Sequence, residues 1–166
     1  MKLLGDVDRE DLTRLLSRFG LRLVETPRGE DIRGSYWGGS EAGLVGSEIH
    51  ARAETPVHSI LHETSHYVCM SPSRRASLLR DAGGDDAEET AVCYLQILLA
   101  ERLAGMGRAQ MLLDMDRWGY SFRLGSTEAW FERDSEDARS WLLARDLIDG
   151  SAAPMWKLRE GSCDNE

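Results

Sequence analysis

The sequence lacks three features: a cysteine framework, a long apolar run and an excess of basic charge. Its three cysteines, Cys69, Cys93 and Cys163, are odd in number, and their spacing fits neither a disulfide scaffold nor a zinc knuckle. This cysteine usage favours a reducing compartment, and we expect a cytoplasmic protein.

Neither membranes nor nucleic acids are expected as partners. The longest nearly apolar stretch, residues 91–100, is interrupted by Gln96 and is too short to cross a bilayer. Gly5-Asp6 directly follows the first four residues, so no signal-peptide apolar core is present. With 20 Lys and Arg against 29 Asp and Glu, the chain has a net charge of -9 and lacks the basic surface that DNA or an anionic membrane requires.

The chain of 166 residues has no internal repeat and no low-complexity linker, so we expect one domain over residues 1–150 and a frayed tail over residues 151–166. Apolar periodicity and capping residues predict an α+β fold with a helical majority and a small antiparallel sheet. The predicted strands cover residues 21–25 and 44–52, and the second of these is expected at an edge. The predicted helices cover residues 8–18, 55–70, 74–81, 87–104, 108–118, 127–133 and 136–148.

The four histidines of the chain lie close together, between His50 and His66, and two of them belong to the HExxH pattern His62-Glu63-Thr64-Ser65-His66. On a helix, side chains at i and i+4 share a face, with Cβ atoms about 6 Å apart. Two imidazoles in that arrangement can bind one cation, and Glu63 then lies beside an open coordination position. The pattern predicts a metal site with His62 and His66 as ligands.

A third ligand is expected from the next long helix, because a catalytic zinc ion takes three protein ligands and keeps one position open. Glu88 shares a helical face with apolar residues at i+3, i+4, i+7 and i+11, and a carboxylate on such a face needs a cation or hydrogen bonds. Glu89 shares a less apolar face with Val92, Cys93 and Gln96. We therefore predict Glu88 as the ligand, with Glu89 as the alternative.

The HExxH pattern followed by Glu88-Glu89-Thr90-Ala91 resembles the gluzincin branch of zinc metallopeptidases, in which a Glu-x-x-Ala segment on a second helix supplies a ligand. The resemblance covers residues 57–99. It implies a zincin-like fold with one active-site helix and one glutamate helix, Zn²⁺ held by His62, His66 and Glu88, and Glu63 as general base. Metzincins are excluded, because Cys69 and Pro72 stand where their Gly and third His belong.

The chain departs from the gluzincin pattern at one position of interest. Gluzincins often carry Asp or Asn four residues after the ligand Glu, where it orients a histidine. For Glu88 that position is Val92, so a group that orients the histidine must come from elsewhere.

A second resemblance leads to a different reaction. Ser59, Leu61, the HExxH pattern and Arg74-Arg75 together are similar to elongation factor P hydroxylase, over residues 59–75 only. That likeness implies a two-His-one-carboxylate Fe²⁺ site and a protein substrate. Imidazole and carboxylate ligands suit Zn²⁺ and Fe²⁺ alike, so the motif leaves both metals open.

We expect a peptidase in which a metal-activated water attacks a peptide or protein substrate and Glu63 transfers the proton. The developing oxyanion needs a donor, for which Tyr120 is the first candidate, with Tyr94 and Arg123 as alternatives. The alternatives to a peptidase are an Fe²⁺ hydroxylase and a non-catalytic metal-site regulator. His50 falls outside the helical ligand spacing, and Cys69 is interpreted as a core residue. His58 is interpreted as a capping or surface histidine, with a place at or beside the metal as the alternative. The sequence does not indicate the oligomeric state.

Overall fold

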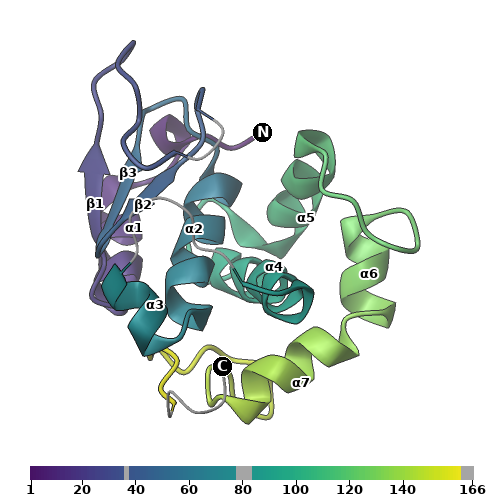
Figure 1. Cartoon of the computed structure of the whole chain (residues 1–166). Helices are drawn as coiled ribbons and strands as arrows, with labels where there is room; N and C mark the ends of the chain where they lie inside the picture. The colour runs from purple at the N-terminus through teal and green to yellow at the C-terminus, as the bar shows by residue number, and fades with distance from the viewer. Residues whose placement is uncertain (36–37, 78–83, 162–166) are drawn as a thin grey trace.

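The computed structural model describes residues 1–35, 38–77 and 84–161, and within them it confirms the α+β class with a helical majority. In chain order the elements are η1 (Leu4–Asp6), α1 (Arg9–Ser17), β1 (Arg22–Glu25), β2 (Gly43–Val45), β3 (Glu48–Ala51), α2 (Val57–Cys69), α3 (Pro72–Ser77), α4 (Asp86–Ala100), α5 (Gly107–Trp118), α6 (Thr127–Arg133) and α7 (Glu136–Ala144). A short sheet and α1 lie on one side of the molecule with α3 below them, α2 runs beside the sheet, and α4, α5, α6 and α7 make up the rest (Figure 1).

The sheet is mixed, whereas an antiparallel sheet was predicted. Its strand order is β1-β3-β2. A two-residue turn joins β2 to β3, and Gly46 adopts a φ of +58° there, which suits the hairpin turns that glycine favours. The strand β3 then pairs in parallel with β1. The segment 44–52, expected to be one edge strand, therefore contains parts of two strands, of which β2 lies at an edge and β3 lies in the centre between β1 and β2.

The helix α2 packs against the sheet on one side and against α4 on the other. Two small polar residues make this double packing possible, because Thr64 and Ser65 donate their hydroxyls to the carbonyls of Ile60 and Leu61 one turn earlier. Both side chains are completely buried. The HExxH segment thus lies in the middle of a core helix, with the hydroxyls of Thr64 and Ser65 satisfied.

The helix α4 is buried around nearly its whole circumference. Asp85 caps its N-terminus by accepting a hydrogen bond from the backbone N–H of Glu88 at 2.8 Å. Every residue from Ala91 to Ala100 is buried, because α2, α5 and α7 all contact α4. A helix that is apolar on all sides is the expected centre of a helical core.

The chain after Gly150, for which we expected a frayed tail, makes specific contacts as far as Arg159. Pro154 forms a bridge with Ile148, and the backbone N–H of Arg159 donates to the carbonyl of Val68 at 2.9 Å. The Arg159 side chain is buried. Residues 78–81 of the predicted helix 74–81 and residues 162–166 of the tail, including Cys163, lie outside the described residues.

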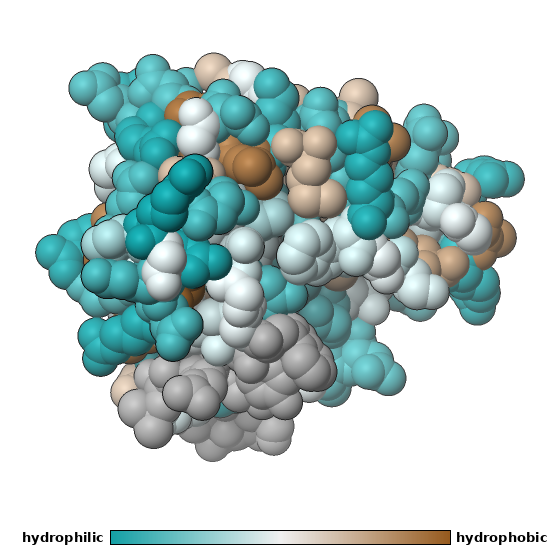
Figure 2. Space-filling view, turned by 90° about the horizontal axis from the view of Figure 1, so that it is seen from above, coloured by the Kyte–Doolittle hydropathy of each residue, from teal (hydrophilic) through white to brown (hydrophobic). Residues whose placement is uncertain are grey.

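The surface is mainly hydrophilic on the face shown in Figure 2, where hydrophobic residues form small separate groups. That distribution agrees with the net charge of -9. Among the helices that the structure describes, none has both the length and the apolar character needed to cross a bilayer.

Candidate metal centre

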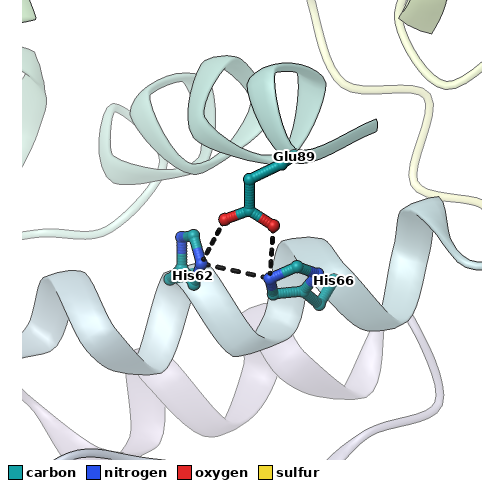
Figure 3. A group of neighbouring side chains, drawn as sticks. All are labelled: His62, His66 and Glu89. Atoms are coloured by element: carbon teal, nitrogen blue, oxygen red, sulfur yellow. Dashed lines mark hydrogen bonds and ion pairs between the residues drawn. The ribbon is translucent and has the colours of Figure 1, made fainter. Parts of the chain in front are cut away.

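Three side chains from two helices converge on one point (Figure 3). His62 and His66 extend from adjacent turns of α2, and Glu89 extends toward them from the first turn of α4. The two Nε2 atoms are 3.1 Å apart. The carboxylate oxygens of Glu89 lie 3.2 Å from the Nε2 of His62 and 3.2 Å from the Nε2 of His66.

These separations are close to those between neighbouring ligand atoms around one metal ion. Zinc binds imidazole nitrogen and carboxylate oxygen at about 2.0–2.1 Å, so ligand atoms in tetrahedral geometry lie about 3.3 Å from one another. The two imidazole nitrogens are 3.1 Å apart, and each lies 3.2 Å from a different oxygen of Glu89. The donor set therefore fits a small divalent cation and leaves a fourth position for water.

The centre is open to solvent on one side. The side chain of Glu89 is 49% exposed, whereas those of His62 and His66 are 17% and 8% exposed. The histidines thus form the more buried side of the centre, and the carboxylate of Glu89 lies on the side that faces solvent.

Glu88, which the sequence favoured as the third ligand, does not face the histidines. Its carboxylate accepts two hydrogen bonds from the Arg74 guanidinium, at 2.8 and 2.7 Å, and one from Arg159 at 3.2 Å. The structure brings Glu89 to the imidazoles instead. The inference that a buried Glu88 needs a cation agrees with the structure, but that cation is a pair of arginines.

The apolar face that Glu88 shares did not identify the acid that faces the histidines, because α4 has no polar face opposite it. All its sides are packed, so the side that carries Glu88 contacts the C-terminal segment while the side that carries Glu89 contacts α2. A hydrophobic stripe identifies the inward side only when the opposite side meets water.

Gln96 orients His62 and was not predicted as a site residue. Its Oε1 accepts a hydrogen bond from the Nδ1 of His62 at 2.8 Å, which leaves the Nε2 lone pair directed at the point of convergence. Its Nε2 donates to the carbonyl of His58 and to the hydroxyl of Tyr120. The signal for this role was the single amide in the apolar run 91–100, because a buried amide requires partners.

Tyr120 and Glu63 lie beside the histidine pair. The Tyr120 ring centroid is 5.8 Å from that of His62, and burial raises the pKa of Tyr120, so the phenol keeps its proton and can donate it in a hydrogen bond. The charge of Glu63 contributes in the same direction to the pKa of Tyr120. The other two candidate donors point elsewhere, since Tyr94 stacks on Phe131 and Arg123 pairs with Asp134.

The electrostatics of the centre favour a positive charge between the three side chains. Burial opposes charge on His62, but contacts with Tyr120, Cys93 and Glu89 outweigh it and raise the pKa of His62 well above its ordinary value. Burial acts to raise the pKa of Glu89, yet hydrogen bonds with His62 and His66 hold that pKa well below its usual range. A cation bound at this point replaces protons, so its affinity is expected to increase with pH.

The remaining histidines and Cys69 lie outside the ligand cluster. His50 pairs with Glu48 on β3, at 3.1 Å. The interpretation of His58 as a capping or surface residue was wrong, because His58 is 1% exposed, with its Nδ1 3.2 Å from the Tyr120 hydroxyl. Cys69 is fully buried in the core, and burial raises the pKa of its thiol.

The buried His58 is expected to make stability fall in acid. Burial, with a smaller contribution from His62, lowers the pKa of His58 to about 4, against about 6.5 in the unfolded chain. Between these pH values the unfolded state binds more protons, so the free energy of unfolding decreases by up to about 3 kcal/mol as the pH falls from 6.5 to 4. Urea unfolding of metal-free protein at several pH values measures this slope, and H58Q should show a shallower one. Parallel curves for the two proteins would contradict the assignment.

Comparison of the chain with protein-family models, with curated proteins and with solved structures found no match.

Proposed function

We propose that the protein is a metal-dependent hydrolase that cleaves peptide bonds, with Zn²⁺ held by His62, His66 and Glu89. The observation that carries this proposal is the convergence of His62, His66 and Glu89 at the exposed end of α4, with one ligand atom from each residue within 4.8 Å of the others. The first two ligands belong to an HExxH segment, a pattern in which the intervening glutamate, here Glu63, serves as the base.

Each neighbouring residue has a role in this reaction. A bound zinc ion would supply Lewis acidity and lower the pKa of its water toward about 7. Glu63 takes the proton from the attacking water and passes it to the leaving amine. Tyr120 donates a hydrogen bond to the carbonyl oxygen of the substrate as negative charge develops there. Gln96 holds both His62 and Tyr120, so it keeps the ligand and the donor in a constant relation.

Metal removal and restoration test the proposal. Protein purified without added metal should contain about one zinc ion per chain and should cleave members of a fluorogenic peptide library. Dialysis against a chelator should abolish cleavage, and stoichiometric Zn²⁺ should restore it. A double variant, H62A/H66A, serves as the metal-free control. Failure of the chain to retain any divalent cation would overturn the proposal, and turnover that requires Fe²⁺ and dioxygen would replace it with the hydroxylase reaction.

A further inference from the structure

The C-terminal segment Met155–Glu160 lies against the end of α2 that carries His66. Near the start of this segment the Trp156 ring lies under the Arg18 guanidinium, 3.5 Å from ring centroid to Cζ, and beside Phe19 of the chain that follows α1. Figure 1 shows the segment passing below α2. Near its end, the backbone N–H of Arg159 donates to Val68 in the last turn of α2.

Two arginines together satisfy the last three carbonyls of α2 and the carbonyl of its cap residue, Met70. These carbonyls have no partner within the helix and carry the negative end of its dipole. Arg75 donates to the carbonyls of Tyr67 and Met70, at 3.2 and 2.6 Å. Arg159 donates to the two carbonyls between these. Its backbone N–H donates to the carbonyl of Val68 at 2.9 Å, and its Nη1 donates to the carbonyl of Cys69 at 3.2 Å. Arg75 also donates to the carbonyl of Arg159 at 2.7 Å, which joins the two caps.

The same Nη1 of Arg159 reaches the second metal-bearing helix. It lies 3.2 Å from the carboxylate of Glu88, which Arg74 holds from the other side. Glu88 is 3% exposed, so its charge depends on these two arginines. Arg159 therefore links the C-terminus of α2 to the N-terminus of α4.

Both connections lie next to metal ligands. Cys69 is three residues after His66 on α2, and Glu88 directly precedes Glu89 on α4. The distance between His66 and Glu89 is set by how these two helix ends are held together. Contacts between Arg159, Cys69, Glu88 and Arg74, hereafter the Arg159 clamp, hold the two ends at that point.

We propose that Arg159 is a positioning residue for the metal centre, acting through the Arg159 clamp. The inference rests on the proposed metal site. The clamp keeps Glu89 facing the two imidazoles before the cation arrives, so binding does not have to order the helix ends. Partners that orient metal ligands contribute about 10- to 100-fold to affinity, and we expect about 10-fold for Arg159 because it acts through the backbone.

Cobalt provides the test, since the visible absorption of bound Co²⁺ reports the arrangement of its ligands directly. Co²⁺ affinity and spectrum are measured at a temperature well below unfolding for wild type, R159M, R159K and E88Q. The control is R145M, because Arg145, like Arg159, lies over the Trp141 ring. Arg145 caps a helix carbonyl, at Trp141, and within the described residues it acts on Glu88 and Cys69 through its charge, without a hydrogen bond to Glu88 or to the end of α2. We expect R159M and E88Q each to lose about 10-fold in affinity with an altered spectrum, R159K to recover part of the loss, and R145M to match wild type.

The outcomes separate this inference from the proposed function. Absence of Co²⁺ binding by the wild-type protein would reject the metal site itself. Wild-type binding together with unchanged affinity and spectrum in R159M and E88Q would reject the clamp alone. The double variant R159M/E88Q gives a further check. Because Arg159 and Glu88 belong to one clamp, the double variant should lose no more Co²⁺ affinity than the weaker-binding of the two single variants. Additive losses would contradict the proposal.

Discussion

Replacing Glu63 with glutamine should lower kcat/KM for peptide cleavage by about 10³-fold and leave the metal in place. General acid–base groups contribute about 10²- to 10⁴-fold, and glutamine has the size of glutamate but cannot accept the proton of the attacking water. Glu63 is not a member of the ligand cluster, so the variant should bind zinc as the wild type does. The measurement is steady-state hydrolysis of a fluorogenic peptide, with metal content determined on the same samples.

A matched glutamate elsewhere separates this effect from a general loss of charge. Glu132 lies exposed on α6, and E132Q should retain the wild-type rate. Cleavage at the wild-type rate by E63Q with zinc bound would remove Glu63 from the reaction. Loss of zinc from E63Q would show that Glu63 supports the ligands and would leave the base unassigned.

The second large effect is expected at the carboxylate ligand. Replacing Glu89 with alanine should weaken zinc binding by more than about 100-fold, because loss of a direct ligand exceeds the 10- to 100-fold typical of the groups that only orient ligands. The side chain of Glu89 is 49% exposed, so its removal leaves no cavity in the core. Competition with a chromophoric chelator measures the affinity, and thermal unfolding of the metal-free protein confirms that the variant is folded.

The adjacent acid supplies the comparison for this experiment. E88Q retains Glu89 and alters only the Arg159 clamp, for which we expect about 10-fold weaker binding. A larger loss in E88Q than in E89A would reverse the assignment and restore Glu88 as the ligand. The two variants therefore test which acid is the ligand: Glu88, as predicted from the sequence, or Glu89, which the structure places at the centre.

Parts of the centre were accessible from sequence because they depend on geometry within one helix. His62 and His66 converge because positions i and i+4 share a face, whatever surrounds the helix. Gln96 was accessible in principle, as the one amide in an apolar run. The contact between Gln96 and His62 could not be predicted, because it joins residues that are 34 positions apart in the sequence.

The sequence by itself determined the helical majority, the histidine pair and the presence of two acids at the start of the next long helix. Only the tertiary structure decided which acid faces the histidines, because Arg74 and Arg159 lie on one side of α4 and the imidazoles on the other. It also decided that β3 pairs in parallel with β1 and that the chain after Gly150 packs against α2. Each of these depends on contacts between segments distant in sequence, whose arrangement follows from how the whole core packs and not from the local preferences of any one segment.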